Sequence, residues 1–131
     1  MKEFSLKIRV YYEDTDAEGV VYYGNYFKFI ERGRTEMFRK IGLNQSQMGR
    51  EDVYFVVHSL SSNFISSAKL DDEIEVRTII SELDLTSLTF KQNIIFGDRK
   101  IFNATVKIVC VKKENGVFKP IKIPTFITEK V

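Results

Sequence analysis

The sequence contains few of the residues from which most metal and nucleophile sites are built. Among its 131 residues there is one cysteine, Cys110, and one histidine, His58. A single cysteine excludes an internal disulfide and a zinc site built on cysteine pairs, and a single histidine excludes a histidine-rich metal site. A Ser-His-Asp or Cys-His mechanism would have to run through His58. We therefore expect no bound metal and, because a lone thiol suits reducing surroundings, a cytoplasmic protein.

An excess of one charge and long apolar runs are also missing. The 20 basic and 18 acidic residues leave a formal net charge of +2, which is too close to neutral to indicate a nucleic-acid partner. No apolar run approaches the roughly 20 residues that a membrane-spanning helix needs. The N-terminal MKEFSLKIRVYY has no apolar signal core. We expect neither a transmembrane segment nor nucleic-acid binding.

The apolar content, in contrast, is ample for a folded core. Hydrophobic residues make up 44% of the chain and include eleven phenylalanines and six tyrosines, so extensive disorder is not expected. No repeat, low-complexity tract or linker is visible, and the length suits a single domain. The sequence predicts one domain over residues 1–131.

Helical and strand patterns follow one another in the order β-α-β-β-β-β. A helix is predicted over residues 25–41, where apolar residues recur at three- and four-residue steps and Gly42 supplies a stop. Gly33 costs about 1 kcal/mol against alanine inside a helix, and close packing against a neighbouring backbone is a plausible reason for it. Gly97-Asp98 is a hairpin signal. The predicted strands cover residues 4–13, 54–65, 73–83, 87–96 and 100–112, with a short tail strand after Gly116.

This order describes an α+β protein with an antiparallel sheet and one long helix. A helix of 17 residues is about 26 Å long and covers one face of such a sheet. The other face and the sheet edges need cover, which a second copy supplies. We expect a homo-oligomer, a dimer or a tetramer.

An acidic junction lies between the first strand and the helix and reads EDTDAEGVVYYGNYF over residues 13–27. An apolar stretch and a Gly-Asn pair follow its carboxylates and lead into the helix. One interpretation is a solvated turn whose carboxylates cap nearby amides. The other is that the junction aims one carboxylate at a ligand beside the helix N-terminus. The four carboxylates are Glu13, Asp14, Asp16 and Glu18, of which all but Asp16 are typical structural or solvated charges.

Several segments together resemble a known family. They are YYEDTDAEGVVYYGNY at 11–26, ERGRTE at 31–36, FVV at 55–57, AKLDD at 68–72 and SLTF at 87–90. With them the chain resembles the 4-hydroxybenzoyl-CoA thioesterase family, including its Tol-Pal-associated acyl-CoA thioesterase branch. The resemblance implies the hot-dog fold, in which an antiparallel β-sheet wraps around one long α-helix. It also implies hydrolysis of acyl-CoA to a free carboxylic acid and coenzyme A.

The resemblance also implies which residues carry the reaction. The family's catalytic Asp in a D-x-x-G stretch maps onto Asp16, with Gly19 three residues on, and its activating amide maps onto the backbone N–H of Tyr23. Bacterial acyl-CoA members commonly have His at the position of Tyr23, and the amide serves with either side chain. A carboxylate can act as a general base or as a nucleophile. Helix N-terminal amides stabilise the oxyanion that develops. No metal is required, and the only coenzyme is the coenzyme A of the substrate.

Further candidates surround this pair. His58 is either a structural strand residue or a lining residue of the acyl pocket, Asn25 is also a candidate helix cap, and Cys110 is a small core residue. Basic residues are expected near the coenzyme A phosphates. The candidate substrate-binding residues are Val20, Val21, Asn25, His58, Ser67 and Ala68, and the candidate phosphate contacts are Lys69, Lys91, Arg99 and Lys100.

Two other functions fit the same sequence. One is a thioesterase that acts on acyl groups attached to acyl carrier protein, which a steep preference for carrier-bound substrate would reveal. The other is a non-catalytic module that binds acyl-CoA, since a fold does not dictate an activity. The acyl chain length, the choice between aryl and aliphatic groups, and the role of Asp16 as base or nucleophile stay open.

Overall fold

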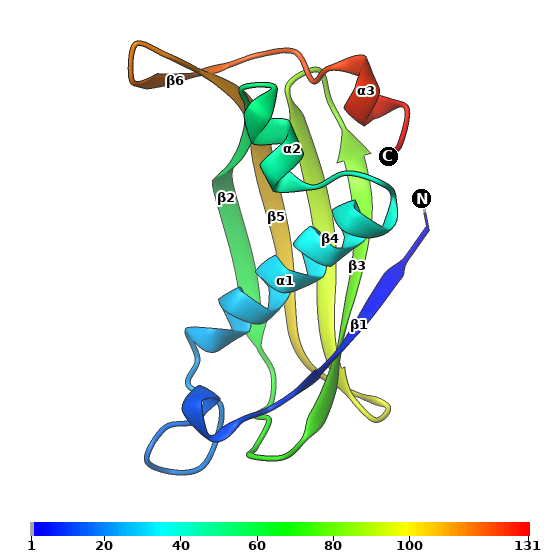
Figure 1. Cartoon of the computed structure of the whole chain (residues 1–131). Coiled ribbons are helices and arrows are strands. Elements are labelled where there is room, and N and C mark those ends of the chain that lie inside the picture. Colours follow the sequence, from blue (N-terminus) through cyan, green and yellow to red (C-terminus); the bar gives the residue numbers. More distant parts are fainter. Residues whose placement is uncertain (1) are drawn as a thin grey trace.

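The computed structural model describes residues 2–131 and shows a curved antiparallel sheet with a long helix laid across one face (Figure 1). The strand order is β1-β3-β4-β5-β2, and β6 pairs with β5. Two shorter helices, α2 and α3, lie toward the far end of the sheet from the N-terminus of α1. The strands are β1 (Phe4–Arg9), β2 (Val53–Phe64), β3 (Glu73–Leu83), β4 (Ser87–Phe96), β5 (Arg99–Glu114) and β6 (Val117–Pro120), and the helices are α1 (Asn25–Lys40), α2 (Gln45–Arg50) and α3 (Thr125–Thr128).

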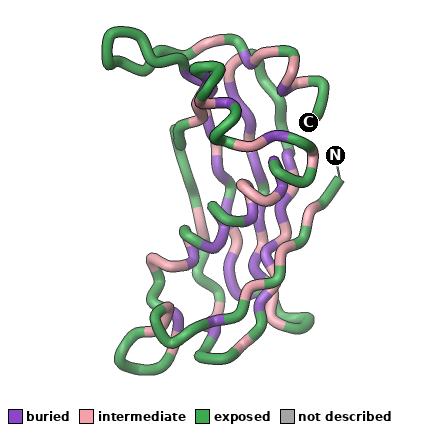
Figure 2. The backbone as a smooth tube through the Cα atoms, in the orientation of Figure 1, coloured by how far each residue is buried: buried purple, intermediate pink, exposed green. Residues whose placement is uncertain are grey.

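The core lies between α1 and the inner face of the sheet. Buried and more exposed residues alternate along β3 and β4, which is the pattern of a sheet with one covered face. Figure 2 shows the buried residues concentrated on the central strands and on the side of α1 that faces them. The α+β arrangement and the long helix that the sequence predicts are therefore confirmed.

Gly33 allows α1 to lie close to the sheet. A Cβ atom at this position would come within 2.8 Å of Val76 Cγ1 and 2.9 Å of Thr78 Oγ1. Real Cβ atoms do not approach other atoms this closely, so the helix can sit at this depth only with glycine here. Gly33 is therefore closely packed as predicted, but against side chains of β3 and β4 and not against a neighbouring backbone.

The first strand is shorter than predicted. The sequence favoured a strand over residues 4–13, but β1 ends at Arg9 and a 3-10 turn, η1, follows at Tyr12–Asp14. The Asp14 carboxylate accepts a hydrogen bond from the Tyr11 N–H at 2.8 Å, and this side-chain bond competes with strand pairing. The acidic residues therefore begin a compact loop instead of extending the strand.

The two edges of the sheet differ in character. β1 carries Lys7 and Arg9, which pair with Glu73 of β3, whereas β2 presents apolar side chains, with Val57 55% and Phe64 49% exposed. Within residues 2–131 no helix has the length and apolar character needed to cross a bilayer.

Candidate active site

The acidic junction folds back on itself beside the start of α1. Thr15 and Val21 form an antiparallel bridge, and the Asp16 N–H donates to the Val20 carbonyl at 2.9 Å. Gly19 closes the turn with a φ of +79°, a conformation that glycine adopts without a Cβ penalty. The conformational role predicted for Gly19 is confirmed, and the turn brings Asp16 opposite the residues that lead into the helix.

The Asp16 carboxylate is exposed, and only one of its two oxygens accepts a hydrogen bond from the protein. Its Oδ1 accepts a hydrogen bond from the Glu18 N–H at 2.9 Å, which is the local capping that a turn aspartate commonly makes. Its Oδ2 meets no donor among residues 2–131. One oxygen thus holds the carboxylate in place, and the other is free to accept a proton or to attack a carbon.

The N-terminus of α1 presents free amide donors next to this loop. Neither the Tyr23 N–H nor the Gly24 N–H finds an acceptor within the described part of the chain. The first turn of α1 contains no acidic residue, so no carboxylate there offsets the positive end of the helix dipole. Such donors are suited to a negatively charged oxygen.

Asp14 ties the loop to the helix. Its carbonyl accepts hydrogen bonds from the Tyr22 N–H at 3.0 Å and from Asn25 Nδ2 at 2.9 Å. Asn25 is the first residue of α1, and Gly24 occupies the N-cap position. The interpretation of Asn25 as a helix cap is therefore wrong, because its side chain binds the loop instead of a helix amide.

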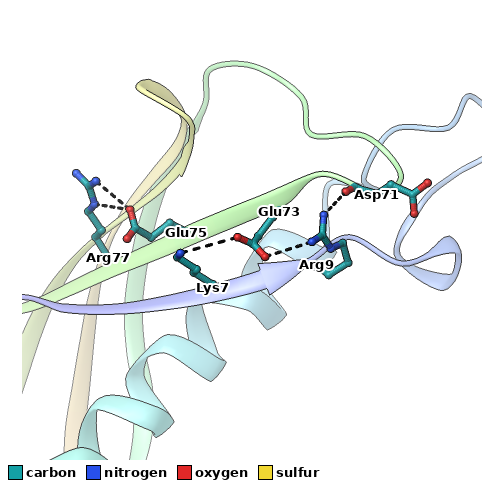
Figure 3. A network of polar contacts seen from close by, with 6 residues as sticks. All are labelled: Lys7, Arg9, Asp71, Glu73, Glu75 and Arg77. Atoms are coloured by element: carbon teal, nitrogen blue, oxygen red, sulfur yellow. Dashed lines mark hydrogen bonds and ion pairs between the residues drawn. The ribbon is translucent and has the colours of Figure 1, made fainter.

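A second turn, residues 68–72, supports the loop from the other side. The Val21 N–H donates to the Ala68 carbonyl at 2.9 Å, and Val20 pairs with Lys69. Arg9 fixes this turn from β1, since its Nη1 donates to the Asp71 carbonyl at 2.7 Å while its Nη2 pairs with Glu73 (Figure 3). The predicted residues Val20, Val21 and Ala68 are thus brought together with Asp16.

Tyr26 links the same turn to the helix. Its hydroxyl accepts a hydrogen bond from the Ala68 N–H at 3.1 Å, and its ring stacks on Phe102 with centroids 5.3 Å apart. Burial is the main cause of the raised pKa of Tyr26, so the hydroxyl stays protonated at neutral pH. The helix start, the loop and the turn therefore share one hydrogen-bonded frame.

An exposed aromatic surface borders the helix N-terminus. The Tyr23 ring, 61% exposed, lies edge-on to Phe64 at the end of β2, with centroids 6.0 Å apart. Phe64 also contacts the ring of Phe27 on α1. These rings give the free amides an apolar border on the side of the β2 edge.

The remaining predicted residues are distributed unevenly. Ser67 is exposed and immediately precedes the supporting turn. Lys69 adjoins the loop, and Arg99 follows the β4–β5 turn at the same end of the sheet as the loop (Figure 1). Lys91 lies in the middle of β4, on the face away from α1, since its neighbour Gln92 faces the helix. His58 lies at a bulge in β2, six residues or about 20 Å from Phe64. The structure therefore does not bring Lys91 or His58 to the loop.

Other contributors carry no local signal in the sequence. The Tyr26 hydroxyl and Arg9 act through contacts with residues far along the chain. No cluster of metal-ligating side chains occurs within residues 2–131.

Comparison with known proteins gives consistent matches over most of the chain. The model of the thioesterase superfamily matches residues 18–102. The chain is similar to the acyl-CoA thioesterase YbgC of Haemophilus influenzae, with 41% identity over 122 residues that cover 92% of this chain and 88% of that protein. It is also similar to the acyl-CoA thioester hydrolase YbgC of Escherichia coli, with 44% identity over 109 residues, 82% of this chain and 81% of that protein.

Solved structures agree with these relatives. A probable thioesterase from Bartonella henselae superimposes with a TM-score of 0.87 at 33% identity, over 94% of this chain and 100% of that chain. The 4-hydroxybenzoyl-CoA thioesterase of a Pseudomonas species superimposes with a TM-score of 0.90 over the whole of both chains. Its identity is 19%, so this second likeness shows the fold alone.

Proposed function

The chain belongs to the thioesterase superfamily and is an acyl-CoA thioester hydrolase of the hot-dog fold, and from this premise we propose which of its residues carry the reaction. Asp16 activates the attacking group, and the amides of Tyr23 and Gly24 stabilise the thioester oxygen. The observation that supports this proposal is the position of two unpartnered helix amides beside an exposed carboxylate with one free oxygen.

The proposed reaction has two steps. Asp16 Oδ2 takes a proton from a water molecule, and the water oxygen bonds to the thioester carbon. The carbonyl oxygen then carries the negative charge and accepts hydrogen bonds from the amides of Tyr23 and Gly24. The C–S bond breaks as the carbonyl re-forms, and the coenzyme A thiolate leaves and takes up the proton that Asp16 removed from the water, which restores the carboxylate. In the nucleophilic variant Oδ2 itself bonds to the carbon and water hydrolyses the mixed anhydride.

The supporting turn gives the substrate a place to enter. Val20, Val21, Ser67 and Ala68 lie along the loop and turn that flank Asp16, and we assign them to the thioester channel. Lys69 belongs to the β2–β3 connection and Arg99 begins β5, and these two connections lie at the same end of the sheet (Figure 1). Lys69 and Arg99 are the candidate contacts of the coenzyme A phosphates. We propose no metal and no cofactor beyond the coenzyme A of the substrate, and a cytoplasmic location suited to the free thiol of Cys110.

We also propose that the working form is a homo-oligomer whose basic unit is a dimer formed through β2. The strand is an edge of the sheet, so it offers unpaired backbone groups along with exposed Val57, Leu60 and Phe64. An edge of this kind is complementary to a second copy of itself in antiparallel orientation. The exposed Tyr23 ring lies next to Phe64 and extends this apolar surface to the loop that contains Asp16.

The proposal is tested by thiol release from a panel of acyl-CoAs, short to long and aromatic, with wild type and Asp16→Asn. Asparagine preserves the hydrogen bond from Glu18, so the loop should keep its shape, yet it can neither take a proton nor attack. We expect turnover to fall by at least roughly 100-fold. Asp98→Asn, an exposed change in the β4–β5 turn, serves as the control.

Two outcomes would change this assignment. Full turnover by a folded Asp16→Asn variant would remove Asp16 from the mechanism. Wild-type turnover only on acyl groups attached to acyl carrier protein would select the carrier-bound substrate.

Tyr23→Phe keeps the backbone amide and should keep turnover within a few-fold. This variant distinguishes a role of the Tyr23 amide from a role of its phenol hydroxyl.

A further inference from the structure

Arg34 is a cationic side chain without a counter-ion on the inner side of α1. It is half-buried, and its Nη1 donates to the Gln92 Oε1 at 3.0 Å. Among residues 2–131 it has no carboxylate partner in an ion pair. Burial lowers the pKa of Arg34, and the nearby charge of Glu31 raises it by a smaller amount. Glu31 is thus near Arg34 but outside ion-pair distance, and the half-buried guanidinium lacks a direct carboxylate contact to offset its desolvation.

Gln92 cannot satisfy the rest of the guanidinium. Its side chain is 1% exposed, and its Nε2 already donates to the Ile30 carbonyl and to Thr78 Oγ1, both at 2.8 Å. Only its single carbonyl oxygen is left for Arg34. A guanidinium has five N–H donors, so most of those on Arg34 remain free, and the buried network holds the group in a fixed position.

The guanidinium lines a small cavity of mixed polarity. The cavity has a volume of about 160 Å³ and lies between α1, the start of α2, β2 and β5. Phe38, Phe55, Val57 and Ile108 form apolar walls, whereas Thr35, Gln45 and the exposed Glu31 add polar groups. The space is suited to a few carbon atoms that end in a group able to accept hydrogen bonds.

The two ends of β2 lie next to this cavity and next to the loop that contains Asp16, respectively. Phe55 and Val57 of the cavity belong to the first half of the strand, whereas Phe64, which contacts Tyr23, is its last residue. In an antiparallel pair of β2 strands related by a two-fold axis, the first half of one strand lies beside the end of the other, about 4.8 Å away. A two-fold axis at the middle of β2 would set the cavity of one protomer next to the helix N-terminus of its partner.

We propose that Arg34 binds a carboxylate at the far end of the acyl group whose thioester is held at the partner's Asp16. The enzyme then prefers acyl-CoAs with a short acyl chain that carries a terminal carboxylate. This inference rests on the proposed function of Asp16 and on the dimer through β2. It adds a specificity-determining residue that acts across the subunit boundary.

A carboxylate matches the free groups of Arg34 better than other chain ends do. It accepts two parallel N–H bonds from one guanidinium and supplies the missing negative charge. An alkyl end would leave most of the guanidinium donors without an acceptor. Because Glu31 is exposed, its side chain can turn toward solvent when the substrate carboxylate arrives.

The first test compares pairs of acyl-CoAs with equal carbon number, one alkyl and one with a terminal carboxylate. For wild type we expect a higher kcat/KM on the carboxylate member. Arg34→Gln, which can still donate to Gln92, should lower that value by roughly 10- to 100-fold and leave the alkyl value within about threefold. Arg39→Gln is the control, because Arg39 lies on the same helix, is exposed and pairs with Glu36.

Equal rates of wild type on both members, or an equal loss on both in a folded Arg34→Gln variant, would overturn the proposal. If Arg34→Gln does not fold, Arg34→Lys decides, since it keeps the charge but loses the two-pronged contact and should retain part of the preference. An absence of hydrolysis on every acyl-CoA would instead contradict the proposed function itself.

The second test asks whether Arg34 acts on the partner's site. Asp16→Asn and Arg34→Gln are unfolded together and refolded as mixed dimers. If Arg34 acts across the boundary, each mixed dimer contains one site with both wild-type residues, and fast hydrolysis of the carboxylate substrate returns. If the mixture shows only the rate of the Arg34→Gln component, Arg34 serves its own chain's site, and the proposal across the boundary is wrong.

Discussion

At the scale of single residues, Gly33 shows how little free space separates α1 from the sheet. A methyl group at this position would come within 3.0 Å of side-chain atoms of Val76 and Thr78. Overpacking of this kind costs roughly 1–3 kcal/mol, whereas alanine gains up to about 1 kcal/mol in helix propensity. We expect Gly33→Ala to lower the free energy of unfolding by about 1–2 kcal/mol, measured by urea denaturation.

Gly49 provides the control for this prediction. It also lies in a helix, but the closest atom to a Cβ there is Tyr54 Cε1 at 3.5 Å, which is ordinary van der Waals contact. Gly49→Ala should therefore be neutral or slightly stabilising. Equal effects of the two changes would mean that helix propensity, and not the contact with β3, decides the cost at Gly33.

Cys110 links burial to the pH dependence of stability. The side chain is fully buried, and burial raises the pKa of its thiol to about 11. The folded state therefore holds this proton more tightly than the unfolded chain, whose thiol titrates at about 8.5. The stability that follows is complete below about pH 8.5 and is lost as the pH rises toward 11.

The measurement is the rate of thiol modification together with urea midpoints at several pH values. We expect native Cys110 to resist modification at pH 8 and to react fully in denaturant. The Cys110→Ala variant should lose part of the decline in stability above pH 8.5 that wild type shows. Rapid modification of the native protein at pH 8 would place the thiol outside the core.

At the scale of elements, the sequence predicted best those strands in which buried and exposed residues alternate regularly. The bounds predicted for β3 and β4 agree with the structure, because one buried face leaves an unbroken period of two. The six-residue α2 was missed, since only Met48 of its residues is buried and no helical period can show in so short a segment. The end of β1 was misplaced because a side-chain hydrogen bond of Asp14, invisible to periodicity, ends the strand.

The candidate site could be predicted only where it is local in sequence. Asp16, Gly19 and Tyr23 fall within one continuous motif, so the loop and the start of the helix could be predicted together, while the catalytic roles of Asp16 and the Tyr23 amide stay predictions. Arg34 meets Gln92 across 58 positions, and the sequence holds no sign of that contact. Lys91 was chosen for its charge, but strand alternation places it on the opposite face of the sheet from α1.

The junction between loop and helix leads to a prediction about positioning. Asn25 is the side-chain link from α1 to the Asp14 carbonyl, so its loss should loosen the loop relative to the free amides. We expect Asn25→Ala to cost about 1 kcal/mol of stability and to lower kcat with a smaller change in KM. Thiol release and thermal unfolding measure the two effects.

Asn44→Ala is the matched control for Asn25→Ala. Asn44 also makes a hydrogen bond to the backbone at a helix start, since its Oδ1 accepts from the Gln47 N–H at 2.7 Å. Loss of the Asn44 side chain should lower the free energy of unfolding by roughly 0.5–2 kcal/mol, as for Asn25. It should leave kcat unchanged. A parallel fall of kcat in both variants would show that general destabilisation, and not the position of the loop, limits turnover.

At the scale of the whole molecule, the two sheet edges suggest one direction of assembly. Charged pairs along β1 and β3, including Lys7 and Arg9 with Glu73, discourage a further strand from joining that edge (Figure 3). β2 has no comparable protection, and its exposed apolar side chains run from Val57 to the aromatic border of the active loop. The proposed assembly through β2 would bury the surface that is costly in water and would cover the open side of the candidate site.

A charge on β2 should for this reason affect assembly and catalysis together. Leu60→Lys introduces a lysine at a position that is 38% exposed in the single chain. A two-fold axis through β2 would bring the two lysines of a dimer near one another. Burying two like charges side by side is costly, so the dimer should be destabilised. We expect monomers in light scattering at micromolar concentration and a loss of thioesterase turnover in the same range. Leu85→Lys, at a 68% exposed position between β3 and β4, should alter neither. A Leu60→Lys variant that stays dimeric and active would move the interface elsewhere. One that becomes monomeric yet keeps its turnover would show that each protomer holds a complete site. One that also keeps a preference for a terminal carboxylate would contradict the role of Arg34 across the subunit boundary.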